Sequence, residues 1–213
     1  MSAAASFPQT IYFVTDVELD GPDPSRNSMI SFASAALDVE RGVVGTFEVN
    51  IAPLAGRSPD PHTAAWWATQ PLAYEASTHD PRAPEEAMIA FADWVESFAG
   101  VRVFASRPLM LDGVWIDEYL RSFAGARVFG APWEGRRLFH GAGLDIGSLL
   151  LGLFGWSYAQ AHDVSIPADW LGGHEHTHRA IDDALGYAHV LHRALRISAE
   201  QPKKNEDFRN VPA

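Results

Sequence analysis

Three strand-like segments follow one another at the start of the chain, and this order constrains the fold more than any other feature. Residues 10–20, 28–38 and 42–53 combine apolar, β-branched and aromatic residues in short runs. A Pro/Gly loop separates the first two runs, and the turn-like stretch VERG separates the second from the third. Because short connections of this kind join antiparallel neighbours, the sequence predicts a three-strand meander.

Helical patterns dominate the rest of the chain. Residues 62–77 have a helical pattern with a proline in its middle, and residues 84–100 have an amphipathic pattern that begins with Pro and acids and ends in Gly. A meander followed by alternating helices and strands predicts an α/β fold with a mixed sheet covered by helices. The remaining expected elements are a strand at 101–106, a helix at 111–125, a strand, turn and helix at 136–156, and a last helix at about 178–196.

The length of 213 residues suits one domain. We expect a single domain at 10–197, preceded by an N-terminal extension at 1–9. The polar segment 198–213 is expected to be a flexible tail.

Composition narrows the classes of function. The chain has no cysteine, which excludes disulfide scaffolds, thiolate zinc sites and thiol nucleophiles. A net charge of −11 argues against a protein that coats duplexes non-specifically, although bound cations would reverse the field locally. No run approaches the ~20 apolar residues of a membrane span, and the start lacks a signal-peptide pattern. We therefore expect a cytoplasmic protein without membrane association.

The first strand carries two carboxylates. Residues two apart in a strand point to the same face, so Asp16 and Glu18 project together with Tyr12 and Val14. Two carboxylates on one face repel each other unless a cation or a proton lies between them. The alternative is a strand that simply runs out into its polar loop.

A third acid interrupts an apolar helix face. At helical spacing, Asp112 shares its face with Trp115 and Ile116, whereas Asp117 and Glu118 fall on the opposite, polar side, where solvated acids belong. An acid in an apolar stripe is expected to cap the helix, to be hydrogen-bonded or to bind a metal ion. Its position near the helix start keeps the capping alternative open.

The last helix separates two adjacent aspartates. Asp183 lies three residues after Ala180 and four before Tyr187, on the apolar face. Asp182 points nearly opposite, toward the polar face. The sequence therefore predicts two strand carboxylates and two helix acids that face inward, and four oxygen donors suit Mg²⁺ or Mn²⁺ better than zinc.

Three alternating histidines precede this helix and support a second hypothesis. In an extended loop, His174, His176 and His178 would project to one side and bind zinc or nickel, as in a transition-metal-binding protein. This hypothesis leaves the inward-facing Asp112 unexplained and makes the pairing of Asp16 with Glu18 a coincidence. A third hypothesis is a catalytically inactive module that binds nucleic acid or a partner protein.

Three segments resemble, in order, the motifs of the DEDDh-type 3′–5′ exonucleases, the superfamily of RNase T, oligoribonuclease and proofreading subunits. FVTDVELDG contains Asp16 and Glu18, LDGVWI contains Asp112, and HTHRAIDDA contains His178 and Asp183 at the family's spacing. The stretch HTAAWWATQ is similar to a small subgroup of bacterial and phage exoribonucleases with paired tryptophans. The chain departs from many members where Leu-Asp-Gly follows Glu18 in place of Thr-Gly, and where Arg-Pro replaces a His-Asn ahead of the second motif.

The resemblance implies an RNase H-like fold that hydrolyses single-stranded RNA or DNA from its 3′ end to nucleoside 5′-monophosphates, with RNA slightly favoured. It implies two divalent ions, Mg²⁺ or Mn²⁺. Asp16, Glu18 and Asp183 would hold one ion, and Asp16 with Asp112 would hold or orient the second. It also implies His178 as the general base, a role that suits an imidazole near neutral pH.

Substrate contacts are expected around these motifs. Core packing is the favoured role for at least two of the three candidate tryptophans, and base stacking is the alternative. A homodimer through the apolar segment 146–156 is a further hypothesis, which gel filtration would test. The candidate substrate residues are Leu19, Asp20, Trp66, Trp67, Arg107 and Trp115.

Overall fold

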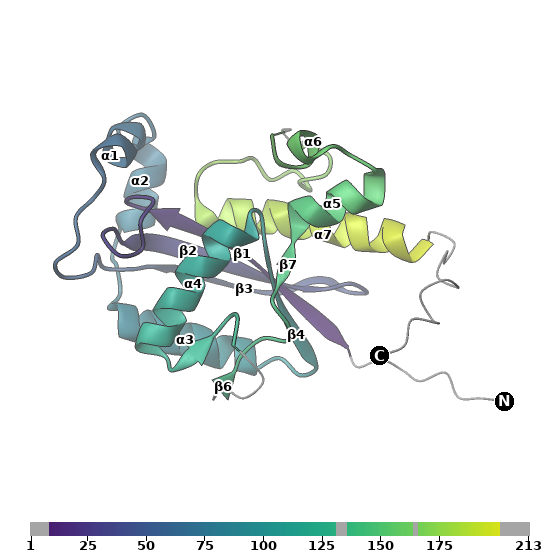
Figure 1. Ribbon diagram of the computed structural model, residues 1–213, viewed down its shortest axis with the longest axis horizontal. Coiled ribbons are helices and arrows are strands. Elements are labelled where there is room, and N and C mark those ends of the chain that lie inside the picture. Colours follow the sequence, from purple (N-terminus) through teal and green to yellow (C-terminus); the bar gives the residue numbers. More distant parts are fainter. Residues whose placement is uncertain (1–8, 131–135, 164–165, 201–213) are drawn as a thin grey trace.

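The computed structural model describes residues 9–130, 136–163 and 166–200 (Figure 1). The expected N-terminal extension, apart from residue 9, lies outside these residues, as does the tail from 201 onward. A five-stranded mixed sheet with the order β3-β2-β1-β4-β7 forms the centre of the molecule. The predicted α/β fold is therefore confirmed.

The sheet contains the predicted antiparallel meander. β1 (Thr10–Leu19) pairs antiparallel with β2 (Met29–Asp38), which pairs antiparallel with β3 (Gly42–Asn50). On its other edge, β1 pairs parallel with β4 (Val101–Ser106), and β4 pairs parallel with the short β7 (Leu144–Asp145). β1 is therefore a central strand with neighbours on both sides.

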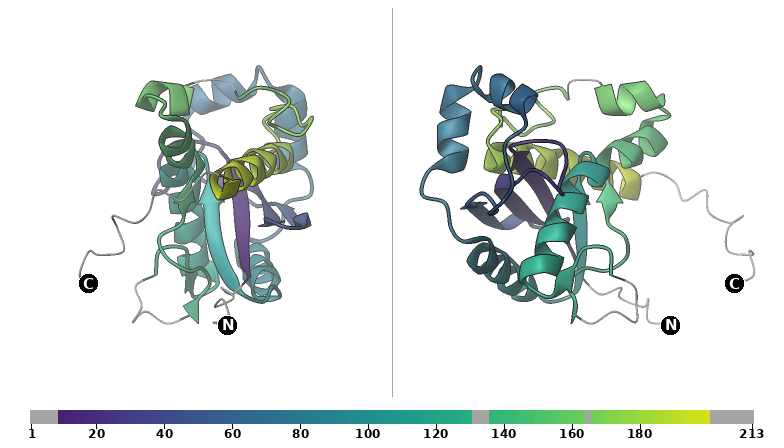
Figure 2. Two further views of the ribbon diagram at one scale, coloured as in Figure 1. Left: turned by 90° about the vertical axis from the view of Figure 1, so that its right-hand side faces the viewer. Right: turned by 60° about the vertical axis from the view of Figure 1, so that its left-hand side comes forward.

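Helices cover both faces of the sheet (Figures 1 and 2). α7 (Ala180–Glu200) packs across β1, β2 and β3 on one face, and α5 (Ile146–Phe154) lies against α7. α3 (Pro84–Glu96) and α4 (Leu109–Phe123) cover the opposite face. The two faces bury separate cores, because Phe13 belongs to the core under α3 and α4 whereas its neighbour Val14 belongs to the core under α7.

Two short helices stand beyond the end of β1 (Figure 1). α1 (Pro61–Trp67) begins at Asp60, whose carboxylate accepts hydrogen bonds from the backbone N–H groups of His62 and Thr63. α2 (Pro71–Thr78) begins at a proline, which confirms the predicted break in this helical segment.

Several boundaries and small elements were not expected. α7 continues to Glu200, so residues 198–200 are helical and do not belong to a flexible tail. β6 (Arg136–Arg137) begins where a strand was expected, but α6 (Tyr158–Asp163), β5 (Ala126–Arg127) and the pairing of β5 with β6 go beyond the prediction. These elements contain only two to six residues each, too few for a period to stand out in the sequence.

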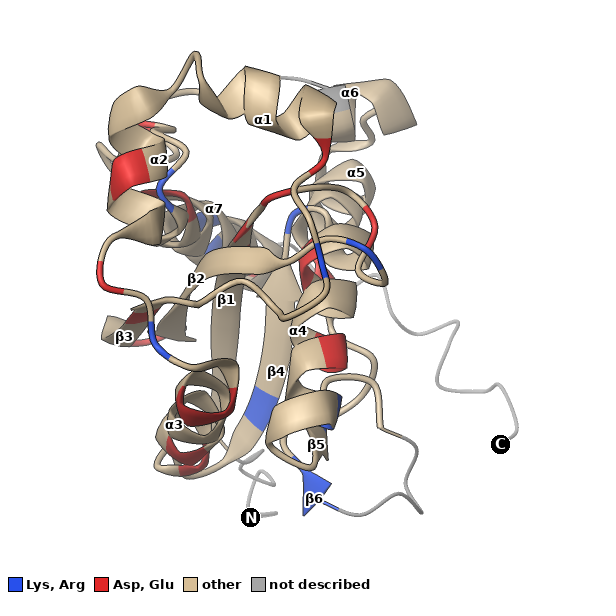
Figure 3. Ribbon diagram, turned by 90° about the vertical axis from the view of Figure 1, so that its left-hand side faces the viewer, with Lys and Arg blue, Asp and Glu red and all other residues tan. Residues whose placement is uncertain are grey.

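An ion-pair cluster ties β6 to α3. The guanidinium of Arg136 lies 2.6 Å from Glu96 and 3.3 Å from Asp93. Figure 3 colours the basic residues of β6 blue and the acidic residues of α3 red.

The apolar residues of α5 pack within the chain. Ile146 and Leu150 are fully buried in the core under α7, and Leu149 and Phe154 pack against the same core. A homodimer through this segment stays a prediction. Among the described residues, no helix is long and apolar enough to cross a membrane.

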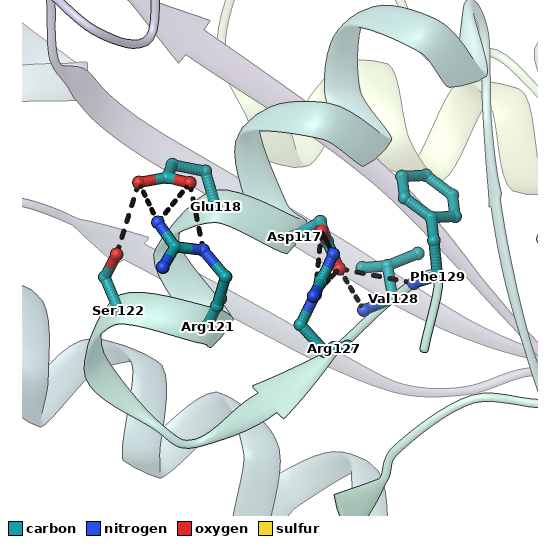
Figure 4. Close-up of polar contacts among 7 residues, drawn as sticks. All are labelled: Asp117, Glu118, Arg121, Ser122, Arg127, Val128 and Phe129. Atoms are coloured by element: carbon teal, nitrogen blue, oxygen red, sulfur yellow. Dashed lines mark hydrogen bonds and ion pairs between the residues drawn. The ribbon is translucent and has the colours of Figure 1, made fainter. Parts of the chain in front are cut away.

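The burial of Asp117 differs from what the sequence predicts. We expect it to be solvated, yet it is 8% exposed and its carboxylate accepts hydrogen bonds from the backbone N–H groups of Val128 and Phe129 (Figure 4). The Arg127 guanidinium pairs with the same carboxylate at 2.8 Å. The polar face of α4 therefore anchors the segment that follows the helix.

Replacing Asp117 by Ala is expected to lower the free energy of unfolding by about 3 kcal/mol, because it strips buried N–H groups of a charged acceptor. The melting temperature should then fall by roughly 6 to 12 °C. The control is Glu118→Ala, which removes the neighbouring ion pair of Glu118 with Arg121 on the surface of the same helix (Figure 4). This variant should lose less than about 1 kcal/mol. Equal destabilisation of the two variants would contradict the anchoring role.

Candidate metal and catalytic site

β1 delivers two carboxylates to the face that α7 covers. Asp16 and Glu18 follow Val14 at intervals of two residues, and Val14 lies in the core under α7. Antiparallel pairing continues to Glu18, and the register to β2 shifts immediately after it. The acids therefore sit at the end of a rigid central strand, where the sheet opens into loops.

Small residues let α7 approach these acids. Ala180 and Ala184 of α7 pack against Ala33 of β2, and all three are at most 2% exposed. Ala33 is the register partner of Asp16. Asp183 lies between the two alanines of the helix and is 4% exposed, so it reaches into the interface between helix and sheet.

Three carboxylates converge at this interface. Asp16, Glu18 and Asp183 each offer an oxygen within 4.8 Å of the others, a spacing that can hold a metal ion. Asp183, and not Asp182, is the buried aspartate of α7, as helical spacing predicts. Asp182 accepts a hydrogen bond from the Thr177 hydroxyl at the helix start.

α4 contributes a fourth acid, Asp112, which lies near this group but is not among the three acids within 4.8 Å of one another. It is 3% exposed, and its Oδ2 has no hydrogen-bond partner among the described residues. The capping alternative is wrong, because α4 begins at Leu109 and the carboxylate of Asp145 accepts the Leu109 N–H at 2.9 Å. Asp112 is therefore a buried acid whose charge influences Asp16 and Glu18.

Burial and mutual repulsion favour the protonated acids. Burial, followed by the charges of Asp112, Glu18 and Asp183, raises the pKa of Asp16 well above its usual range. Burial, followed by the charges of Asp183 and Asp112, raises the pKa of Glu18 to about 9. Burial also raises the pKa of Asp112. Carboxylates in such an arrangement bind either protons or a cation, and their oxygen donors fit a hard divalent ion.

The metal-free protein should lose stability as pH rises. A folded-state pKa of Glu18 near 9, above its ordinary 4.5, stabilises the fold at low pH, and this contribution disappears as pH rises from about 4.5 to about 9. In the presence of a chelator at pH 8, Glu18→Gln should therefore raise the free energy of unfolding by about 2 kcal/mol, or the melting temperature by roughly 4 to 8 °C.

Thermal melts at pH 5.5 and pH 8 test this expectation. Adding Mg²⁺ or Mn²⁺ should stabilise the native protein at pH 8 and should stabilise Glu18→Gln less. A variant that is less stable than the native protein at pH 8 without metal would contradict the account of the acid cluster.

His178 ends the loop that leads into α7. Its backbone φ is 58°, in the left-handed region that few non-glycine residues adopt. Its ring meets that of Trp66 edge-on, with centroids 4.9 Å apart. Burial, together with His176, lowers the pKa of His178, so the neutral imidazole prevails at neutral pH.

The three-histidine cage of the second hypothesis does not form. His174 does not belong to the group that His176 and His178 form with Asp183, and its ring lies 5.5 Å from that of His189. His176 contacts the site instead, with its Nδ1 2.8 Å from Asp183 Oδ1. The carboxylate of Asp183 raises the pKa of His176. Sequence reasoning missed this contact, since residues ahead of a helix have no period that predicts their direction.

Leu19 is the last residue of β1, and Asp20 follows it directly. The Leu19 carbonyl accepts a hydrogen bond from the indole N–H of Trp67 at 2.8 Å. Asp20 is 5% exposed, and its carboxylate accepts the backbone N–H of Ser28. Asp20 and Trp67 also line a pocket of about 320 Å³, together with Pro59, Ala64, Ala68, Pro71 and Tyr74.

The remaining candidate substrate residues differ in exposure. Trp66 is 39% exposed beside His178, which leaves part of its ring open to a ligand. Trp115 is 1% exposed within the core under α3 and α4, so it takes the favoured role of core packing and is not a residue that contacts substrate. Arg107 is half-buried, and its guanidinium donates to the carbonyl of Ala161 at 3.0 Å and lies over the ring of Tyr187.

Neither a protein-family model nor a curated protein matches the sequence. Solved structures do match. The nuclease domain of 3′hExo, a DEDDh family member bound to rAMP, superposes with a TM-score of 0.65 at 12% identity, over 93% of this chain and 98% of that one.

Exonuclease I structures are similar too. The enzyme from Methylocaldum szegediense gives a TM-score of 0.59 at 20% identity, over 91% of this chain and 41% of that one. E. coli exonuclease I in complex with a dT13 oligonucleotide gives 0.57 at 16% identity, over 88% and 41%. This chain thus spans less than half of the exonuclease I chains. The chain therefore shares its fold, a mixed sheet flanked by helices, with these exonuclease structures.

Proposed function

We propose that the protein is a metal-dependent 3′–5′ exonuclease that hydrolyses single-stranded nucleic acid to nucleoside 5′-monophosphates. One observation carries the proposal: three carboxylates from β1 and α7 converge within 4.8 Å at a buried end of the central strand. The fold shared with 3′-exonucleases supports it.

Two divalent ions, Mg²⁺ or Mn²⁺, fit the acids. Asp16, Glu18 and Asp183 would hold one ion, and Asp112 with Asp16 would hold or orient the other. The Oδ2 of Asp112, which has no hydrogen bond of good geometry among the described residues, and the raised pKa of Glu18 both favour a cation at this place. Bound ions would activate the attacking water and stabilise the leaving oxygen of the phosphodiester.

The protein's own groups would position the reaction. His178 would accept the proton of the attacking water, because its lowered pKa keeps the imidazole neutral near pH 7. Its left-handed backbone holds the ring at the start of α7, five residues before Asp183 in the sequence. Strain of this kind is typical of residues whose direction matters for function.

Substrate contacts would come from the α1 side of the site. Trp66 lies beside His178 and is open enough to stack on a base, an interaction that contributes roughly 1–3 kcal/mol. Asp20 and Trp67 line the neighbouring pocket, which would take the terminal nucleotide with Leu19. We propose a single strand as substrate, since a chain of net charge −11 would repel a long duplex. RNA is slightly favoured over DNA.

Matched RNA and DNA oligonucleotides, offered as single strands and as blunt duplexes, test the substrate class. With Mg²⁺ or Mn²⁺, single strands with a free 3′ hydroxyl should be shortened with release of 5′-monophosphates, and RNA should be consumed faster. Duplexes should be degraded more slowly. Preferential hydrolysis of duplexes, or release of 3′-monophosphates, would contradict the proposal.

A further inference from the structure

The loop ahead of α7 brings two imidazoles to one carboxylate of the acid cluster. His176, His178 and Asp183 each offer a ligand atom within 4.8 Å of one another. The two histidine rings meet at a centroid distance of 4.6 Å with an angle of 72° between their planes. The other group of possible ligands consists of Asp16, Glu18 and Asp183, so the two groups have only Asp183 in common.

We propose that His176, His178 and Asp183 form a second metal site, selective for a transition-metal ion such as Zn²⁺. Two imidazole nitrogens and one carboxylate oxygen are a ligand set that zinc prefers, with a fourth position left to water. Mg²⁺ instead prefers oxygen ligands in octahedral geometry, which the carboxylate group provides.

Asp183 is a fixed ligand, whereas His176 can adjust its position. Asp183 is held on α7, and its buried Oδ1 has no hydrogen bond of good geometry among the described residues, although His176 Nδ1 lies only 2.8 Å away. The side chain of His176 is 53% exposed, so it can retreat by the few tenths of an ångström that an ion between the two atoms requires. No large movement of the chain is needed.

The site has a regulatory consequence that rests on the proposed function. An ion held by His176, His178 and Asp183 withdraws both the general base and a ligand of the hydrolytic ions. Zinc should therefore inhibit Mg²⁺-supported hydrolysis, and His176 is the residue through which it does so. His176 is not one of the acids of the hydrolytic site. A substitution of His176 can therefore remove a ligand of the zinc ion while the acids that hold the hydrolytic ions stay in place.

Metal titrations of the full-length protein test the site without any assay of activity. Chelator-treated native protein, His176→Ala and Asp16→Asn would be titrated with Zn²⁺ and, separately, with Mn²⁺ by calorimetry. Loss of an outer partner of a ligand already weakens metal binding by roughly 10- to 100-fold, so loss of the ligand His176 should weaken zinc binding at least as much. Manganese binding should respond in the opposite order, weakening far more in Asp16→Asn, which removes a ligand, than in His176→Ala, which removes only a neighbour of the ligand Asp183.

His174→Ala is the matched control, because this histidine of the same loop packs on His189. It should bind zinc like the native protein. Zinc binding that survives in His176→Ala, or that is lost in Asp16→Asn alone, would overturn the inference. A protein that hydrolyses no nucleic acid yet loses zinc binding in His176→Ala would support the zinc site and contradict the proposed function.

Discussion

Replacing Asp183 by Asn is expected to lower kcat/KM for a single-stranded oligonucleotide by at least about a thousandfold, or roughly 4 kcal/mol of transition-state stabilisation. Asp183 is the one acid that α7 contributes to the cluster with Asp16 and Glu18. Asn keeps the volume and removes the charge that holds a divalent ion. The fold should persist, because the substitution also removes like-charge repulsion from a buried site.

Asp182→Asn is the control for this prediction. Asp182 is the sequence neighbour of Asp183, is partly exposed, and bonds to Thr177 at the helix start. Initial rates of both variants with Mg²⁺ and with Mn²⁺ should differ by orders of magnitude, with Asp182→Asn within about threefold of the native enzyme, as for surface substitutions. Comparable rates in the two variants would place the chemistry elsewhere.

Replacing His178 by Ala is expected to lower kcat by about 10²- to 10⁴-fold, the contribution typical of a general base. The native enzyme should lose activity toward acidic pH as His178 takes up a proton below its lowered pKa. The variant should lack this acid limb. A profile of kcat against pH for both proteins measures the difference.

The other histidines of the loop make this test specific. His174→Ala should retain most of its activity, because His174 lies against His189 and away from the acids. Full activity in His178→Ala combined with loss in His176→Ala would identify His176 as the base instead.

The sequence predicts most of the acid site because periodicity determines it. Alternation along β1 places Asp16 with Glu18, and the 3.6-residue helical period separates Asp183 from Asp182. Each periodicity depends only on the local element, and the gathering of Asp16, Glu18 and Asp183 within 4.8 Å of one another agrees with both. The three-strand meander follows from equally local signals, namely short turns between strand-like segments.

Contacts that depend on tertiary structure could not be predicted. Helical spacing places Asp117 opposite Asp112, but only the folded chain shows that Val128 and Phe129 return to bond with it. His176 lies in a loop whose path depends on the left-handed turn at His178, and no periodicity describes such a path. The exposure of Trp66 and Trp67 could not be predicted either. They are adjacent in the sequence, yet Trp66 is exposed and Trp67 is buried.

The most direct test of the account is a time course with a 5′-end-labelled single-stranded oligonucleotide and the native protein, with Mg²⁺ or Mn²⁺ and with a chelator. The proposed function predicts a ladder that shortens from the 3′ end only when a divalent ion is present. Hydrolysis that persists in excess chelator, cleavage that begins within the strand, or no hydrolysis with either ion would contradict it.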